Sequence, residues 1–274
     1  MNSINFNAQI NINRSDKAVA SSLEKLSSGK RINSAADDAA GLAIALKFAA
    51  QIVGADQASR NANDGISMMQ TADSGLENVA DNLQRMRELA VQSANGTYSA
   101  ADRNTMQLEY QQNQAEVQHT VESTEFNGHK LLNDPASLAF QLGPNGKPPT
   151  DRTVVSTTNI LANAQVNDAL SNSDVLSQTT GTDAIGKIDA ALEHVNVERA
   201  RLGATQNRLE STISNLQVSS ENSSAARSRI EDVDYAKQTA ELTRALMVHK
   251  ASLAAAAHSN ISGQMVAGLL NRTF

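Results

Sequence analysis

The 274-residue sequence contains no cysteine and no tryptophan, and aromatic residues make up only 3% of the chain. The lack of cysteine excludes disulfides, thiolate catalysis and cysteine metal sites. The scarcity of large aromatic side chains argues against a thick globular core, which such side chains usually fill. The apolar residues are mostly alanine, leucine, isoleucine and valine, and the first two are strong helix formers. The composition therefore favours thin layers of helices.

Positive charge and long apolar runs are also lacking. The net charge of -6 gives no general attraction for nucleic acid, whose binding requires a positive surface. The N-terminus lacks the basic segment and apolar segment of a cleaved signal peptide, and no run of 18 apolar residues occurs. We therefore expect no nucleic-acid binding and no membrane insertion. A chain of this kind outside the cell would need an export route that reads no cleaved leader.

Apolar residues alternate spacings of three and four from Asp64 to about Gly96, which predicts a helix with a coiled-coil seam. The seam residues are Met69, Ala72, Leu76, Val79, Leu83, Met86 and Ala90. A second helix is expected from about Ala101 to Ser123, and the two helices together predict a helical hairpin. The apolar face of the second helix contains Met106, Tyr110, Val117 and Val121.

The C-terminal third repeats the seam pattern. Its apolar residues at strict sevens are Ile188, Val195, Leu202, Leu209 and Leu216, with Leu192 and Ile213 on the flanking seam. Arg199 and Gln206 interrupt that flank, and polar residues at such positions can fix register and partner choice at a cost in stability. Apolar residues at helical spacing also occur near both chain ends, so we expect the terminal segments to pair as neighbouring helices.

The middle of the chain, from about Asn133 to Asp183, differs in composition. It holds all four prolines and is rich in serine, threonine and asparagine. A turn at Pro144-Asn145-Gly146 separates two β-prone runs, Leu138–Leu142 and Thr153–Thr157, which predicts a hairpin followed by a loop. The predicted fold class is mainly α: the N- and C-terminal segments form a long antiparallel helical bundle or coiled coil, with a small β-hairpin region and a short variable insertion.

Several long motifs occur in a fixed order at the two ends of the chain. The N-terminal part contains Leu26-Ser-Ser-Gly-Lys-Arg-Ile-Asn33, and then Ser34–Ile44, Ala58–Ser67, Leu83–Ser93 and Phe126-Asn-Gly128. The C-terminal part contains Ala226-Arg-Ser-Arg-Ile-Glu-Asp-Val-Asp-Tyr-Ala236. In these motifs, residues 1–142 and 184–274 resemble the bacterial flagellins, the subunits of the flagellar filament.

The resemblance implies an order of domains. Residues 1–40 and 236–274 would form terminal helices that line the filament channel, residues 41–142 and 184–235 an inner helical domain with a β-hairpin, and residues 143–183 a short variable surface insertion. It also implies a structural subunit that polymerises into the flagellar filament for swimming motility, and neither an enzyme nor a cofactor-binding protein. The implied location is the extracellular flagellum, reached by type III export without a cleaved signal peptide.

The implied partners are other copies of the chain, a flagellar export chaperone, the filament cap, the hook-junction proteins and other flagellins. Amphipathic helices of about 20 residues are marginal in water, so we expect the terminal segments to order only when neighbouring subunits cover their apolar faces. The expected subunit-packing residues are Val19, Leu23, Leu26, Met247, Leu253, Ile261, Met265 and Leu269.

A second set of residues is expected to make polar contacts between subunits: Asp37, Asp38, Arg60, Asn61, Arg87 and Glu88. Isolated charges of this kind are more often a solvated helix face, because exposed ion pairs contribute little to stability. The resemblance also implies recognition of the free subunit by a host Toll-like receptor of the innate immune system. The residues that match that site are Arg85, Leu89 and Glu109.

An enzyme and a binding module are the two alternatives to a filament subunit. The five histidines, His119, His129, His194, His249 and His258, show no metal-ligand spacing, and no phosphate loop or nucleophile elbow occurs. His194 and Glu198 lie one helical turn apart, but such pairs are far more often surface contacts than catalytic pairs. The serious rival is a hook-filament junction protein or a flagellin-like adhesin. The motif Leu83–Ser93 follows the filament pattern, which favours the filament subunit.

Overall fold

The computed structural model describes residues 2–135, 137–146 and 150–270, and it leaves the side chains of residues 2–6, 8, 259–260 and 262–270 undescribed. The described residues form helices α1 (Asn2–Ser28), α2 (Ala39–Ala94), α3 (Ala100–Ser123), α4 (Ala164–Ser171), α5 (Gln178–Glu231) and α6 (Tyr235–Leu270). Two compact units result: a terminal unit of residues 1–50 and 222–274, and a central unit of residues 51–221. The predicted mainly α class is confirmed.

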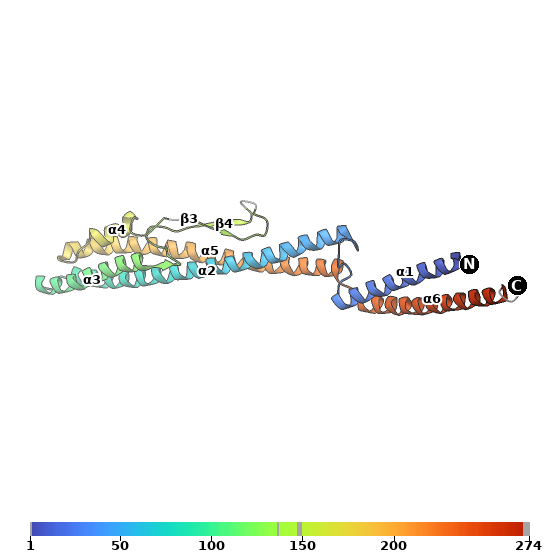
Figure 1. Ribbon diagram of the computed structural model, residues 1–274. Coiled ribbons are helices and arrows are strands. Elements are labelled where there is room, and N and C mark those ends of the chain that lie inside the picture. The colour runs from blue at the N-terminus through green and yellow to red at the C-terminus, as the bar shows by residue number, and fades with distance from the viewer. Residues whose placement is uncertain (1, 136, 147–149, 271–274) are drawn as a thin grey trace. The chain divides into compact units, whose positions relative to one another are not determined.

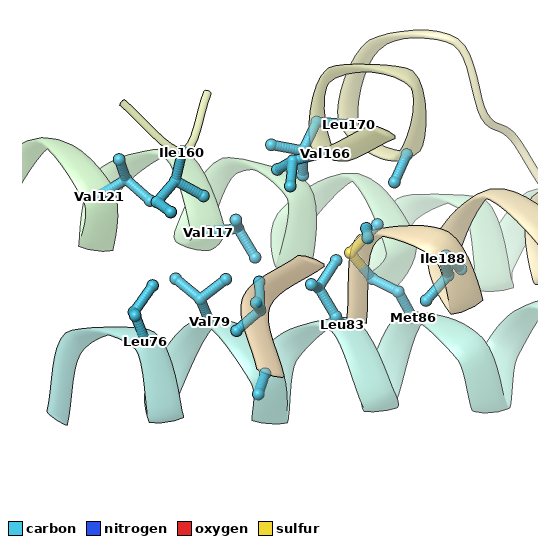
Figure 2. Close-up of a cluster of buried hydrophobic side chains, with 14 of the residues drawn as sticks. Leu76, Val79, Leu83, Met86, Val117, Val121, Ile160, Val166, Leu170 and Ile188 are labelled. Atoms are coloured by element: carbon cyan, nitrogen blue, oxygen red, sulfur yellow. The ribbon is translucent and has the colours of Figure 1, made fainter. Parts of the chain in front are cut away.

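The central unit has one main hydrophobic core, which lies between α2, α3 and α5. All seven predicted seam residues of α2 are buried in it, as are the predicted apolar face of α3 and the strict-seven residues Ile188, Val195 and Leu202 of α5. Figure 2 shows Leu83 and Met86 of α2 pointing toward the elements above them, with Val117 of α3 and Ile188 of α5 close by. The sequence therefore predicted the layer that carries most of the buried apolar surface, because burial of one helix face requires that periodicity.

A polar residue also joins this helix pair. Arg199, which interrupts the predicted seam of α5, donates from Nε to the Asp73 carboxylate of α2 over 2.9 Å. Its Nη2 lies 4.0 Å from the Glu77 carboxylate one turn further along α2, so Arg199 holds α5 against an acidic stretch of α2.

The segment 143–183 differs from the expected exposed insertion. Its second half forms α4, whose N-cap Asn163 accepts hydrogen bonds from the backbone N–H groups of Gln165 and Val166. Val166, Ala169 and Leu170 of α4 are buried in the main core, together with Ile160 and Val175 on either side. Figure 2 shows Val166 and Leu170 above the α2 side chains. A helix of eight residues offers too few repeats for its period to stand out in a serine- and asparagine-rich segment.

Two antiparallel hairpins complete the central unit. The predicted hairpin is confirmed as β3 (Ser137–Gln141) paired with β4 (Arg152–Ser156), each beginning one residue earlier than expected, with Leu138 opposite Val155. Strands β1 (Glu125–Phe126) and β2 (His129–Lys130) form a smaller hairpin. Its turn residues Asn127 and Gly128 have φ of 49° and 79°, the left-handed region that asparagine and glycine tolerate.

The terminal unit is built differently. Helices α1 and α6 lie side by side and antiparallel (Figure 1), and the Ser15 hydroxyl lies 3.2 Å from Nδ1 of His249 across their seam. Among the described residues of this unit, the buried hydrophobic side chains are Ile32 and Ala45. The seam residues Ser15 and Ser22 are small and polar. The terminal unit therefore has very little hydrophobic core of its own.

Replacing Leu83, which is fully buried at the centre of α2, tests the main core. We expect Leu83→Ala to lower the free energy of unfolding of the central unit by about 2 to 5 kcal/mol, because it removes buried methyl groups and leaves a cavity. The measurement is thermal or urea unfolding of the dilute full-length chain followed by circular dichroism. Val91→Ala, at an exposed position of the same helix, is the matched control and should change stability by less than about 0.5 kcal/mol. Equal effects of the two variants would contradict the assigned core.

Candidate functional site

Two loops of the terminal unit are tied together by backbone hydrogen bonds. The Arg31 N–H donates to the Glu231 carbonyl over 2.6 Å, and the Val233 N–H donates to the Gly29 carbonyl over 3.0 Å, so the loop after α1 pairs with the loop after α5. Gly29 has φ of +71°, and a Cβ there would meet the Tyr235 hydroxyl at 3.1 Å. Glycine therefore fits this position for both its backbone conformation and the space available.

The Glu231 carboxylate strengthens this tie. Its side chain is 9% exposed and accepts from the Lys30 ammonium group and from Nε of Arg227, the latter over 2.8 Å. The hydrogen bond from Lys30, followed by that from Arg227, lowers the pKa of Glu231 below its ordinary value. The charged form of this carboxylate is therefore favoured in the folded chain. We name the two paired loops, after α1 and after α5, the connector.

Asp37 and Asp38, two of the predicted intersubunit contacts, shape the turn before α2. The Asp37 carboxylate accepts from the N–H groups of Ser34 and Asn33, and these bonds lower the pKa of Asp37. Asp38 accepts from the Gly41 N–H over 2.9 Å at the beginning of α2. Both residues therefore have a role within the chain, and their contact with a second subunit stays a prediction.

The other predicted polar contacts lie on the central unit and also have partners within it. Arg87 forms an ion pair with Asp189 of α5 over 2.6 Å, and Arg60 donates to Gln57 one turn earlier in α2. Asn61 donates from its side-chain amide to the Gln141 carbonyl of β3 over 3.0 Å. Arg87 therefore joins α2 to α5 and Asn61 joins α2 to β3, whereas the bond of Arg60 stays within α2. The intersubunit role of all three likewise stays a prediction.

The three residues of the predicted receptor site do not share one surface. Arg85 of α2 and Glu109 of α3 are exposed and form an ion pair over 2.6 Å, and Arg85 also pairs with Glu88 over 2.7 Å. Leu89 is only 2% exposed and belongs to the main core. It lies three residues after the buried Met86, so the two side chains share the face of α2 that packs into the core. The expectation that Leu89 lies on the recognised surface therefore differs from the structure.

The predicted packing residues form the largest group of exposed apolar side chains in the terminal unit. The exposed fractions are 52% for Leu23, 65% for Met247, 45% for Leu253 and 49% for Ile261. Val19 and Leu26 are half-buried between α1 and α6. The side chains of Met265 and Leu269 lie outside the described residues. Exposed large apolar side chains concentrated on one pair of helices mark a surface for association.

The first turns of α2 carry further exposed apolar residues that sequence reasoning missed: Ile44, Leu46 and Val53. By length and composition alone, α2 contains one 18-residue window apolar enough to cross a membrane, with a mean hydropathy of 1.4, and only 11% of that window is buried. The high content of alanine, leucine and isoleucine in α2 was the available signal, but the predicted seam began at Asp64 and did not include the first turns of the helix.

Catalytic chemistry finds little support in the described part of the chain. No group of three or more histidine, aspartate and glutamate side chains there could hold a metal ion. His194 lies 3.4 Å from the Asn163 amide, while Glu198 accepts from Arg201 over 2.9 Å. His194 and Glu198 therefore use separate partners, and no acid-base pair arises from them.

The fold and these surfaces define a class of helical protein: a central unit with a complete core, and a terminal coil with exposed apolar faces that association can cover. Comparison with known proteins gives the family. Residues 1–136 match the model of the bacterial flagellin N-terminal helical region, and residues 185–270 match that of the C-terminal helical region. The chain belongs to the bacterial flagellin family, and it is a structural subunit of the flagellar filament.

Three similar proteins illustrate the relationship. A flagellin of Halalkalibacterium halodurans is 46% identical over 96% of this chain and 94% of its own length. The crystal structure of Bacillus cereus flagellin, 30% identical, covers 57% of this chain and 88% of its own, with a TM-score of 0.51. A putative flagellar hook-associated protein from Vibrio parahaemolyticus covers 72% of this chain and 100% of its own with a TM-score of 0.59, but it is only 14% identical and shows the fold alone. The rival junction-protein interpretation is therefore not favoured.

The connector carboxylate gives a pH dependence with a definite sign. Because the pKa of Glu231 is lowered by folding, its stabilising effect is present above the ordinary glutamate pKa and is lost as the pH falls through the folded value. We expect filaments of Glu231→Gln to dissociate at lower temperature than wild type at pH 7, by roughly 1 kcal/mol per subunit. This difference should decrease as the pH falls below the ordinary glutamate pKa, and it should disappear once Glu231 of the folded chain is protonated.

Light scattering of filaments heated at each pH measures this effect. Glu24→Gln replaces an exposed carboxylate of α1 and serves as the matched control. A Glu231→Gln deficit that does not decrease as the pH is lowered, or an equal deficit in the control, would rule out the assigned ion pairs.

Proposed function

We propose that polymerisation of this subunit and folding of its terminal unit are one event. The observation that carries the proposal is the contrast between the two units: the central unit buries a continuous core, while the terminal unit exposes Leu23, Met247, Leu253 and Ile261. Covering the remaining area of each of these side chains contributes roughly 1 kcal/mol or more. A lone subunit lacks this contribution, so the conformational entropy of α1 and α6 favours their disorder.

The same contrast explains how the subunit avoids premature assembly. A disordered terminal segment presents no fixed apolar surface to another disordered segment, so free subunits stay apart at low concentration. At the end of a growing filament, ordered neighbours supply the missing apolar partner. The exposed apolar residues Ile44, Leu46 and Val53 of α2 support the proposal, because packing between subunits is the simplest way to cover them.

Export and partners follow from the family. Members form the flagellar filament, which is extracellular, and the proposed route for this chain is type III export without a cleaved signal peptide. The disordered terminal segments suit passage through a narrow channel. We infer that an export chaperone, the filament cap, the hook-junction proteins and other flagellins bind this subunit during export and growth.

The proposed domain assignments keep their predicted ranges: residues 1–40 and 236–274 line the channel, and residues 41–142 and 184–235 form the inner domain.

Truncation of α6 tests coupled folding. We expect a chain that ends after Thr243 to keep the folded central unit, which needs no part of α6, and to form no filaments because the exposed apolar residues from Met247 onward are gone. Circular dichroism and proteolysis report the central unit, and negative-stain microscopy after addition of salt reports polymerisation. Full-length Met247→Glu should weaken assembly in the same direction, and Lys250→Glu is its control for a new charge on α6. Filaments of normal length from the truncated chain would refute the mechanism.

A second proposal concerns recognition of the free subunit by a host Toll-like receptor. It rests on the resemblance and on the exposed ion pair between Arg85 and Glu109, which joins α2 to α3 and offers both charges to a partner. Leu89 would act from beneath, by fixing the position of this part of α2. Exposed charges can contribute to a contact surface when a partner desolvates them.

Substitution of these residues tests receptor recognition. We expect Arg85→Ala with Leu89→Ala to reduce receptor signalling by about tenfold or more, the loss expected for a charge-assisted hydrogen bond. Arg85→Ala alone should account for most of that loss, because Leu89 is buried. Arg87→Ala, which removes a neighbouring exposed guanidinium paired with Asp189, is the control. The double variant must first match wild type in circular dichroism, and unchanged signalling from it would then remove the proposal.

A further inference from the structure

A groove of about 600 Å³ runs along the α1–α6 pair of the terminal unit. Its lining residues from α1 are Asn11, Arg14, Ser15, Ala18 and Ser22, and those from α6 are Glu241, Arg244, Ala245, Val248 and Ser252. Five of these ten side chains are serine or alanine, and the other five include the charged Arg14, Glu241 and Arg244. We name it the small-residue groove.

The exposed leucines of the same two helices lie on a different side. At about 100° per residue, the α6 groove residues Glu241, Ala245 and Ser252 fall within about 40° of one another, and Leu246 and Leu253 lie about 80° to 140° away from them. On α1, Leu23 is displaced from the groove residues Ala18 and Ser22 by a similar angle. We name Leu23, Leu246 and Leu253 the apolar ridge.

The seam between the helices separates the groove from the ridge. The hydrogen bond between Ser15 and His249 marks the seam, and the half-buried Val19 and Ser252 lie close to it. On both helices the seam lies between the groove side and the ridge side of the helical wheel. Helices α1 and α6 run antiparallel (Figure 1). Because they face each other at the seam, the helical wheels place the groove and the ridge on opposite faces of the pair.

The charges near these faces are complementary. No ion pair joins Arg14 or Arg244, at the groove, to another described side chain. Asp16 lies seven residues before Leu23 and therefore on the ridge face of α1, and its side chain is exposed beyond its contact with His249. The groove lining also contains the acidic Glu241. A ridge that enters the groove would bring the Asp16 carboxylate toward the guanidinium groups of Arg14 and Arg244.

We propose that the apolar ridge of one subunit occupies the small-residue groove of the next. The inference rests on the proposed function, polymerisation through the terminal unit, and it names the two faces that meet. The occupant is a second copy because large side chains on one face and small ones on the other are complementary within a single chain. Contacts between two different faces are heterologous, and they extend without closing when the rotation between copies does not return to the start.

The absence of cysteine makes this pairing testable by disulfide crosslinking in assembled filaments. A double variant Ala18→Cys with Leu253→Cys should give, after mild oxidation, a ladder of dimers, trimers and longer species on a denaturing gel. Ala18→Cys with Leu246→Cys samples a second ridge position. When the single variants are mixed before assembly, only dimers that contain one copy of each should form, and neither single variant alone should crosslink.

The matched control is Lys17→Cys with Leu253→Cys, because residue 17 precedes Ala18 by one helical step and lies outside the groove lining. Filaments are scored by microscopy before oxidation. If the wild-type chain forms no filaments, the proposed function is wrong. If wild type and the cysteine variants all form filaments, but Ala18→Cys gives no ladder with either ridge position, only the groove pairing is wrong. Dimers from Ala18→Cys alone would also overturn it, because they require two grooves to face each other.

A groove-filling variant gives a result even where cysteine variants fail to polymerise. A subunit with Ala18→Trp keeps the apolar ridge, but the tryptophan fills its groove. Once such a subunit has joined the filament end, it should block the addition of the next subunit. Mixed with wild type at about one part in ten, it should shorten filaments by roughly tenfold relative to Lys17→Trp at the same ratio. Equal filament lengths in the two mixtures would overturn the pairing.

Discussion

The structure depends on one constraint: α1 and α6 contact each other through a seam too small to bury their apolar side chains. Ser15 and Ser22 occupy the centre of that seam, and Leu23 and Met247 remain outside it. A helix pair of this kind gains little from its own contact, and it needs a third surface to become stable. The chain keeps that surface on other copies of itself, so stability of the terminal unit depends on subunit concentration.

The central unit obeys the opposite rule, since its core is complete within one chain. The apolar faces of α2, α3 and α5 meet there, and α4 covers them with Val166 and Leu170 (Figure 2). Polar pairs add to this packing: Arg199 joins α5 to Asp73 of α2, and Arg87 with Asp189 joins the same two helices further along. A rigid central unit can therefore persist whether or not the terminal unit is ordered.

How much of this could be predicted from the sequence depended on the length of each pattern. The heptads of α2 and α5 extend over many turns, so the sequence alone predicts seam residues such as Leu83 and Val195. Leu89 was assigned to the surface from its motif, although its spacing from Met86 already placed it on the buried face. The eight-residue α4 lacked repeats, and the bonds between Arg31 and Glu231 join backbone groups 200 positions apart in sequence, which no local pattern reveals.

The connector shows why such an undetected contact matters. A terminal coil that orders only on assembly can influence the rest of its unit only through groups that stay attached to both helices. The loops after α1 and α5 supply this attachment, because Glu231 contributes its carbonyl to the Arg31 N–H and its carboxylate to Lys30 and Arg227. Its side chain is largely removed from solvent, so these bonds are less screened than surface pairs. Assembly that positions α1 therefore also constrains the end of α5, through these bonds and the one from the Val233 N–H to the Gly29 carbonyl.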